Sequence, residues 1–232
     1  RYPGAAALAA LASQRMGAGY TEVICAPKSV DAVRAVSPSL VVRSWKNLSP
    51  SDFPPMRAGH PSANVLGPGF DASSGSCKKL AFTVLESACA PLVVDGGALA
   101  FLATKKGRNL VRERFESGVT ALVKGPKSFI SDGEIVAVMG EGTPALAKAG
   151  TGDVLAGMIG ALLAQGLASF DACVLAATLH ARAGRLAASE LTERCVVAED
   201  LPRYLPLVIR ELEALRGRMG ERESGARYST YG

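Results

Sequence analysis

The chain contains 232 residues, of which 48% are hydrophobic and 20% charged, so it can bury a substantial core. Its formal net charge of +5 at pH 7 favours an anionic ligand, but the basic residues are scattered without interleaved aromatic side chains, which argues against a nucleic-acid partner. The five cysteines are odd in number and far apart, a pattern that predicts neither a zinc site nor a disulfide framework and fits a reducing cytoplasm.

The first part of the chain alternates helical and strand-like segments. Its predicted order is helix 5–16, strand 20–25, helix 29–36 with Ser29 as N-cap, strand 40–43, a Pro/Ser-rich loop 47–61 that contains His60, strand 63–66, helix 74–88 and strand 91–94. The strands are short, apolar and rich in β-branched residues, as in a parallel sheet that is covered on both faces.

The second part continues the alternation and adds a hairpin. Its predicted order is two polar helical stretches, strand 120–123, a hairpin of residues 128–131 and 135–139 around Asp132-Gly133, helix 154–164 with Gly166 as C′ residue, and helices 170–191 and 199–216. Helix 154–164 is wholly apolar, but its 11 residues are too few for the ~20 that cross a bilayer. We expect one α/β domain over residues 1–216 and a disordered tail over residues 217–232, where arginines stand among Gly and Ser.

Three successive strands end in groups that can hold a ligand. They are the Gly67-Pro68-Gly69 turn, Asp95 and Lys124. Open α/β sheets bind ligands at the carboxyl ends of their strands. We therefore expect one crevice that collects these ends and the helix start at Gly150.

The helix start itself combines a Gly-rich turn, Gly150-Thr151-Gly152, with the carboxylate Asp153. Free N–H groups and partial positive charge at such an end suit a phosphate or an oxyanion. Asp153 can take a proton from a hydroxyl while the amides stabilise the phosphoryl group. The alternative is an ordinary capped helix start.

Other candidate residues carry weaker signals. Residues 124–128, read as Lys124, Gly125, Pro126, Lys127 and Ser128, offer an ammonium, flexible backbone and a hydroxyl for a polyphosphate, or form a solvated turn. Asp95 suits a Mg²⁺-bound water, a substrate hydroxyl or a helix cap. His180 is expected to be a packed or surface group, and no cluster has the spacing of a metal site made by protein ligands alone.

Residues 150–157, Gly-Thr-Gly-Asp-Val-Leu-Ala-Gly, with residues 161–166, Ala-Leu-Leu-Ala-Gln-Gly, resemble the signature of the NAD(P)H-hydrate dehydratase family, the carboxyl-terminal YjeF-type domain of the ribokinase-like superfamily. Further matches are the Pro-Gly-Ala of residues 3–5, the Gly-Pro-Gly of 67–69, the Lys-Gly of 124–125 with Ser128, and the His-x-x-Ala-Gly of 180–184. The resemblance implies a ribokinase-like three-layer α/β/α fold with a central, mostly parallel sheet.

The resemblance also implies an activity: ADP- or ATP-dependent repair of hydrated NADH or NADPH with Mg²⁺, by phosphorylation of the hydrate hydroxyl and elimination of phosphate. Asp153 is then the catalytic base. The implied nucleotide-binding residues are Lys124, Gly125, Pro126, Lys127, Ser128, Gly150, Thr151 and Gly152. The implied substrate-binding residues are Ala5, Gly67, Gly69, Asp95 and Asp153. A cytoplasmic homo-oligomer, a tetramer, is expected, with no membrane or nucleic-acid partner.

The chain departs from the family pattern in three places. The strand that precedes Pro-Gly-Ala is absent, the acidic segment reads Asp95-Gly96-Gly97, and the Thr-Pro-His-x-Gly-Glu segment has no counterpart between Asp95 and Lys124. We expect omitted pieces rather than a divergent, impaired member, because a lost edge strand would leave backbone groups unpaired. Two other functions stay open: a ribokinase-like kinase of a vitamin-type alcohol, and a nucleotide-binding protein without catalysis.

Overall fold

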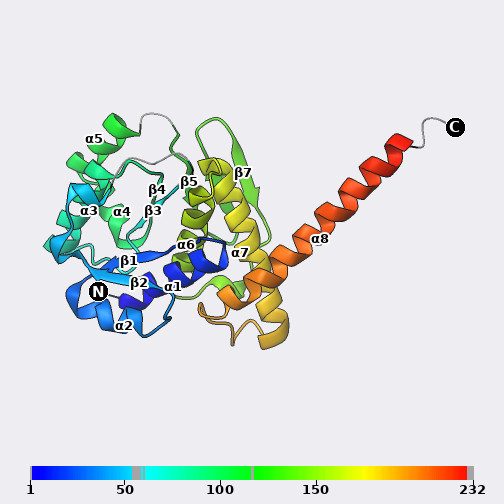
Figure 1. Cartoon of the computed structure of the whole chain (residues 1–232), viewed down its shortest axis with the longest axis horizontal. Coiled ribbons are helices and arrows are strands. Elements are labelled where there is room, and N and C mark those ends of the chain that lie inside the picture. The colour runs from blue at the N-terminus through cyan, green and yellow to red at the C-terminus, as the bar shows by residue number, and fades with distance from the viewer. Residues whose placement is uncertain (1, 54–58, 60, 116–117, 229–232) are drawn as a thin grey trace.

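The computed structural model describes residues 2–53, 59, 61–115 and 118–228, without the side chains of residues 47 and 216–228. His60 and part of the predicted loop 47–61 lie outside the described residues. The chain forms an α/β fold in which helices α3, α4 and α5 lie to one side of strands β3 and β4, and helices α6 and α7 to the other (Figure 1). No helix in the described part combines the length and apolar character that a membrane crossing needs.

The helices agree with the predicted segments within a few residues, except at the carboxyl end. Their bounds are α1 Pro3–Arg15, α2 Val30–Arg34, α3 Gly75–Ser87, α4 Leu99–Leu102, α5 Lys105–Arg114, α6 Thr151–Ala164, α7 Ser169–Leu191 and α8 Leu201–Tyr228. Helix α8 passes the predicted end at residue 216 and thus includes most of the segment 217–232, which the sequence predicted to be disordered. Neither Gly217 nor Gly220 ends it, and Pro206 lies inside the helix near its start.

Two capping predictions had different outcomes. Gly166 has φ of +91° at the end of α6, and this left-handed conformation confirms the predicted C′ role. Ser29 occupies the N-cap position of α2, but its side chain forms no capping hydrogen bond. A 3₁₀ turn at Pro27–Ser29 leads directly into the helix and gives Ser29 helical rather than extended backbone angles.

The strands form three hydrogen-bonded groups within the described residues, whereas the sequence predicted a single central sheet. The bounds are β1 Glu22–Cys25, β2 Val41–Ser44, β3 Asn64–Leu66, β4 Leu92–Val94, β5 Ala121–Val123, β6 Ser128–Ser131 and β7 Val136–Met139. Strands β1 and β2 are parallel, as are β3 and β4, and the pairs β5–β6 and β6–β7 are antiparallel. The α/β class with parallel strands is confirmed, and so is the predicted hairpin, β6–β7.

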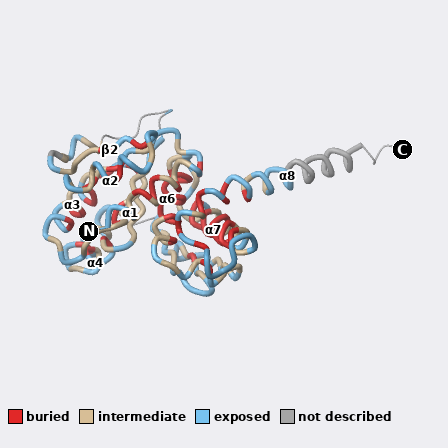
Figure 2. Tube along the Cα trace, turned by 90° about the horizontal axis from the view of Figure 1, so that it is seen from below, coloured by how far each residue is buried: buried red, intermediate tan, exposed pale blue. Residues whose placement is uncertain are grey.

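The core follows the same division into three clusters. The largest surrounds α6, α7 and the start of α8, where the buried residues in Figure 2 are concentrated. A second cluster joins α3 to β3, β4 and α4, and a third joins α1 to β1, β2 and α2.

The glycines of α6 allow neighbouring elements to approach this helix closely. A Cβ atom on Gly157 would lie 2.0 Å from the backbone oxygen of Ala9 in α1, and one on Gly160 would lie 2.4 Å from Val65 of β3. Helix α6 therefore lies directly against α1 and β3, and these contacts fix the position of its amino end.

Candidate active site

The ends of β4 and β5 meet at an ion pair. Asp95 follows β4 and Lys124 follows β5, and Lys124 Nζ donates to Asp95 Oδ1 at 2.9 Å. The Asp95 side chain is 15% exposed and that of Lys124 46%, so the carboxylate is the more enclosed partner. The structure thus brings together the strand ends at Asp95 and Lys124, and the third predicted strand end, at Gly67, lies against Asp95 as well.

The start of α6 forms the next wall of this crevice. A Cβ atom on Gly152 would lie 2.9 Å from Lys124 Nζ and 3.9 Å from Asp95 Oδ2. A side chain at this position would therefore press on the ion pair, which explains why a glycine stands here.

The backbone at the α6 start is held from behind and leaves donors in front. Gly150 is the N-cap with φ of +91°, and the Thr151 hydroxyl lies 2.8 Å from Leu146 O and 2.9 Å from Lys148 O. The N–H groups of Gly152 and Asp153 have no hydrogen-bond partner among the described residues. Such free amides at a helix amino end attract an anion.

Asp153 lies beside these donors in the first turn of α6 and is half-buried. Burial raises the pKa of its carboxyl group, the charge of Asp95 raises this pKa further, and Lys124 opposes the shift. A carboxylate with a raised pKa is a better proton acceptor. An Asp153 that only stabilised the helix dipole would not need a second carboxylate, that of Asp95, near its own carboxyl group.

The Gly67–Gly69 turn joins the amino end of the chain to this region. Gly67 and Gly69 have φ of +116° and +75°, which favour glycine. A Cβ on Gly67 would lie 1.8 Å from Asp95 O, and one on Gly69 would lie 3.4 Å from the Ala5 Cβ. All four predicted substrate residues outside α6 are therefore neighbours.

The predicted nucleotide loop, residues 124–128, connects β5 to β6. Lys124 reaches the crevice, while Lys127 is exposed and Ser128 is partly buried. In the described part, neither Lys127 nor Ser128 forms a hydrogen bond or ion pair with residues 150–152, so their nucleotide role stays a prediction.

Two residues that support the α6 start were not identified as such from sequence. His180 Nε2 lies 2.9 Å from Thr151 O, and burial lowers the pKa of its ring to about 4, so the neutral ring donates to this carbonyl. His180 is thus a packed group, as predicted. Lys148 Nζ donates to the carbonyls of Glu193, Arg194 and Val196. These partners are 45 to 48 residues away, so no local pattern signals them.

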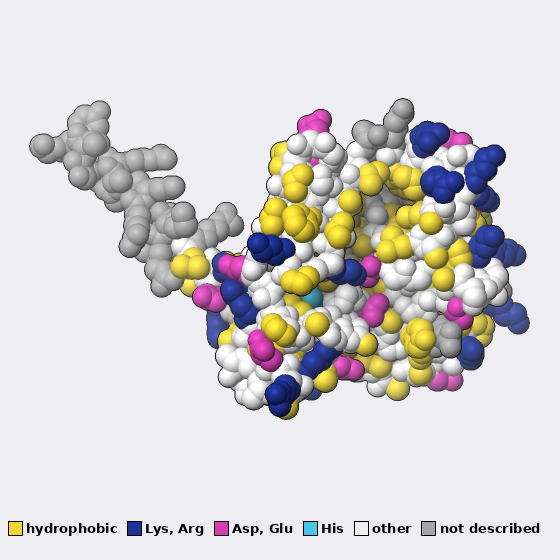
Figure 3. Space-filling view, turned by 180° about the vertical axis from the view of Figure 1, so that it is seen from behind, with side chains coloured by type: hydrophobic (Ala, Val, Ile, Leu, Met, Phe, Trp, Pro, Cys, Tyr) yellow, Lys and Arg dark blue, Asp and Glu magenta, His cyan; other side chains and the backbone are white. Residues whose placement is uncertain are grey.

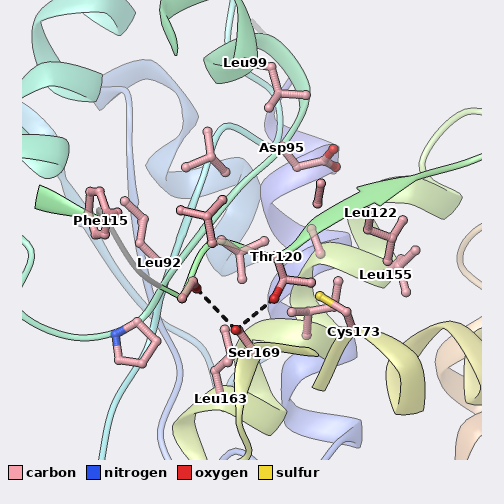
Figure 4. Close-up of a pocket in the computed structure, with 18 of the residues that line it drawn as sticks. Leu92, Asp95, Leu99, Phe115, Thr120, Leu122, Leu155, Leu163, Ser169 and Cys173 are labelled. Atoms are coloured by element: carbon pink, nitrogen blue, oxygen red, sulfur yellow. Dashed lines mark hydrogen bonds between the residues drawn. The ribbon is translucent and has the colours of Figure 1, made fainter. Parts of the chain in front are cut away.

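A cavity of about 720 Å³ begins at Asp95, Lys124 and Gly152 and extends between β4 and β5. Its lining is mainly apolar, with Leu92, Leu122, Leu155 and Leu163 among the side chains in Figure 4. On the opposite face from Figure 1, the space-filling view shows hydrophobic side chains around a hollow (Figure 3). Sequence reasoning missed the cavity.

Comparison with known proteins supplies the family. The family model described as NAD(P)H-hydrate dehydratase matches residues 1–117 and 109–207. The chain belongs to the NAD(P)H-hydrate dehydratase family. The two matched segments meet at residues 109–117. This break in the match lies between Asp95 and Lys124, the interval in which the chain lacks a segment of the family pattern.

Relatives in this family include two kinds of protein. A bifunctional NAD(P)H-hydrate repair enzyme of Vibrio cholerae is 30% identical over 87% of this chain and 46% of its own length. An ADP-dependent (S)-NAD(P)H-hydrate dehydratase of Cenarchaeum symbiosum is 26% identical over 92% of this chain and 86% of its own length. The chain therefore spans about half the length of its bifunctional relatives.

Solved structures show the same fold. An ADP/ATP-dependent NAD(P)H-hydrate dehydratase from Bacillus subtilis, co-crystallized with ATP/Mg²⁺, has a TM-score of 0.72 at 24% identity, over 90% of this chain and 85% of that chain. A ribokinase-like superfamily protein from Enterococcus faecalis has a TM-score of 0.74 at 21% identity, over 90% and 82%. The ribokinase-like fold of this family member is thereby confirmed.

Proposed function

We propose that the chain catalyses the ADP- or ATP-dependent dehydration of hydrated NADH or NADPH. The observation that carries this proposal is the α6 start, where the half-buried Asp153 carboxylate lies beside the unpaired amides of Gly152 and Asp153. A base next to an anion site is the arrangement that phosphorylation of a hydroxyl group requires.

The proposed reaction has two steps. In the first step, Asp153 accepts the proton of the hydrate hydroxyl, and the oxygen of this hydroxyl attacks the terminal phosphorus of the nucleotide. The bond between that phosphorus and the bridging oxygen breaks, and the shortened nucleotide leaves. In the second step the carbon–oxygen bond of the phosphorylated hydrate breaks, a neighbouring ring carbon loses a proton, and inorganic phosphate leaves. The products are the shortened nucleotide, phosphate and the restored dihydronicotinamide ring.

The remaining residues bind and orient in this scheme. Lys124, whose ammonium lies 2.9 Å from Asp95 and beside Gly152 of the α6 start, suits a nucleotide phosphate. Residues 125–128 and 150–152 complete the nucleotide site. Ala5, Gly67, Gly69 and Asp95 contact the hydrate from the other side, because the close contacts of the Gly67–Gly69 turn hold these residues together.

The acidic residues of the crevice are compatible with Mg²⁺ bound chiefly through nucleotide phosphates. The described residues contain no group of three His, Cys, Asp or Glu side chains placed to hold a metal ion. Mg²⁺ commonly binds through one or two carboxylates plus substrate phosphates, and Asp95 is the enclosed carboxylate for that role. When bound there, Mg²⁺ neutralises phosphate charge.

The activity test measures recovery of the reduced-nicotinamide absorbance band from hydrated NADH or NADPH with Mg²⁺ and either nucleotide. Asp153→Asn should abolish recovery and largely retain nucleotide binding. Asp171→Asn is the matched control, because Asp171 stands in the first turn of α7 as Asp153 does in α6, yet is exposed and does not line the cavity that begins at the crevice. Activity of Asp153→Asn equal to that of Asp171→Asn would refute the assignment of the base.

A phosphate-release assay separates this function from that of a small-molecule kinase. The proposed dehydratase releases one phosphate for each ring restored, whereas a kinase accumulates a stable phosphorylated product. Tight nucleotide binding without turnover of any hydrate or alcohol would instead identify a non-catalytic member.

We also propose that the enzyme acts in the cytoplasm as a homo-oligomer, a tetramer, built from a single domain over residues 1–216. Exposed apolar side chains on the β5–β7 sheet, from Val123, Phe129, Val136 and Val138, support a contact between copies. Light scattering of the purified protein should give four times the chain mass, and Val138→Lys should lower it.

A further inference from the structure

One lysine side chain ties the segment that leads into α6 to the segment that leaves α7. The ammonium of Lys148 donates to the carbonyl oxygens of Arg194 at 2.7 Å and Glu193 at 3.1 Å, and also to that of Val196. A lysine ammonium has three N–H donors, which matches these three carbonyls. The backbone of residues 193–196 therefore curls around a single positive charge.

The same turn holds a strained backbone. Thr192, the residue that follows α7, has φ of +71° and ψ of +149°. Among the non-glycine residues that the structure describes, it alone has a positive φ. A β-branched residue adopts such angles only where its surroundings impose them. The Thr192 carbonyl accepts from Cys195 N at 3.1 Å and Val196 N at 3.3 Å, so the strained residue and the Lys148 contacts belong to one closed turn, residues 192–196.

This turn leads into a direct contact with the α6 start. Ala198 follows it, and a Cβ atom on Gly150, the N-cap of α6, would lie 2.9 Å from the Ala198 Cβ. The backbone carbonyl of Lys148 accepts from the Thr151 hydroxyl at 2.9 Å. Lys148 thus holds the first turn of α6 with its backbone and the turn 192–196 with its side chain, and a shift of that turn reaches the helix start.

An exposed lysine elsewhere in the chain makes a different kind of contact. Lys106 Nζ lies 2.6 Å from a carboxylate oxygen of Glu86, and the two side chains are 59% and 45% exposed. Such a pair opens without moving any backbone. Lys148 instead meets backbone oxygens 45 to 48 residues further along the chain. Loss of its ammonium leaves three carbonyls to find other partners, so the turn has to move.

We propose that Lys148 is a positioning residue for the anion site at the α6 start. Its ammonium holds the turn 192–196 in the strained conformation, and the turn supports Gly150 through Ala198. The unpaired amides at the start of α6 therefore keep their direction toward a phosphate group. Lys148 acts through this support and does not touch the ligand. The identity of that ligand, a nucleotide, rests on the proposed function.

The first test removes the ammonium and then supplies it from solution. In the full chain, Lys148→Ala should weaken the binding of ADP with Mg²⁺, measured by calorimetric titration, by roughly tenfold or more, and should raise the nucleotide KM by a similar factor. n-Propylammonium has the same heavy atoms as the lysine side chain from Cγ to Nζ, so it should restore roughly threefold or more of the lost affinity. Tetramethylammonium, which has the same charge but no N–H donor, should restore none.

Two control variants separate the ammonium from other contributions. Lys148→Met keeps an unbranched apolar side chain without the charge, so it should lose as much ADP affinity as Lys148→Ala. It should gain nothing from n-propylammonium, because the methionine side chain fills the space. Lys106→Ala breaks the exposed pair with Glu86, outside the crevice, and should bind ADP as the parent chain does.

A double-variant cycle tests the link to the strained residue. Glycine adopts the backbone angles of Thr192 without strain. Thr192→Gly should therefore restore ADP affinity in the Lys148→Ala chain by more than it changes the affinity of the parent chain, because the turn no longer needs the ammonium to hold it. Equal effects in the two backgrounds would overturn the link between Lys148 and this strain.

The results also distinguish this inference from the proposed function. A parent chain that binds ADP but restores no hydrated NADH or NADPH would refute the proposed activity and leave the binding test of Lys148 in force. A parent chain that binds no ADP would overturn both.

Three results would overturn the role of Lys148 alone. They are parent-like ADP affinity of folded Lys148→Ala or Lys148→Met, no restoration by n-propylammonium, and equal restoration by tetramethylammonium. If Lys148→Ala does not fold, Lys148→Arg replaces it. Its planar guanidinium keeps the charge but cannot meet three carbonyls that converge on one point, so ADP affinity should fall roughly threefold or more, and parent-like affinity would overturn the proposal.

Discussion

The contact between α1 and α6 makes Gly157 sensitive to the smallest side chain. A Cβ atom here would lie 2.0 Å from Ala9 O, 2.7 Å from its carbonyl carbon and 2.8 Å from its Cα. All three atoms are backbone, so the rotation of a side chain cannot relieve the clash. To reach an ordinary contact of about 3.4 Å, the helices must separate by more than ~1 Å locally.

We expect Gly157→Ala to destabilise the fold by ~1–2 kcal/mol. Overpacking a tight contact costs ~1–3 kcal/mol, and the higher helix propensity of Ala offsets up to ~1 kcal/mol of that. For a chain of this size the melting temperature should fall by roughly 2–8 °C. Thermal and urea unfolding followed by circular dichroism measure both quantities.

Gly75→Ala is the matched control. Gly75 begins α3, and a Cβ atom there would have no heavy atom within 4 Å. This change should leave stability unchanged or raise it by up to ~1 kcal/mol. If Gly157→Ala unfolds at the same temperature as the parent chain, or if both variants lose the same stability, the reasoning from backbone contact at α1 is refuted.

Three further predictions concern the crevice. Gly152→Ala should change the free energy of unfolding by no more than ~1 kcal/mol, because the new methyl group meets only the flexible end of the Lys124 side chain. The variant should nevertheless lower kcat/KM at least tenfold, because the methyl group displaces the Lys124 ammonium from Asp95. Unchanged kinetics would contradict the close packing of Gly152 against this ion pair. Asp153→Asn should raise the melting temperature at neutral pH. The raised pKa of the Asp153 carboxyl group means that its protonated form stabilises the fold below the ordinary pKa of Asp, and this contribution is lost as pH rises and the group ionises. The difference in melting temperature from the parent should therefore vanish near pH 3, and a lower melting temperature of the variant at pH 7 would contradict the sign. His180→Gln keeps an N–H donor for the Thr151 carbonyl but does not titrate. The lowered pKa of His180, about 4, stabilises the fold above the ordinary pKa of His, and this contribution is lost as pH falls, so the variant should lose less stability than the parent between pH 7 and pH 4. Equal losses of melting temperature in the two proteins over this pH range would refute the prediction.

Local patterns were sufficient for elements whose signals are local. The hairpin around Asp132-Gly133 and the end of α6 at Gly166 depend on turn and cap conformations that glycine favours, and both are confirmed. The end of α8 was predicted too early, at residue 216. The glycines at 217 and 220 indicated a break there, but a glycine only lowers helix propensity and does not by itself end a helix.

The chemical groups of the site and their order along the chain could be predicted from local sequence patterns. Strand ends that carry Gly67, Asp95 and Lys124, and a helix that begins at Gly150 with Asp153, follow from local pattern and the rule that ligands bind at strand ends. Tertiary structure decided which groups touch: the ion pair of Asp95 with Lys124, and the support of the α6 start by His180 and Lys148. It also decided that β4 and β5 enclose a cavity instead of pairing, because strand neighbours are chosen by packing between segments far apart in the chain.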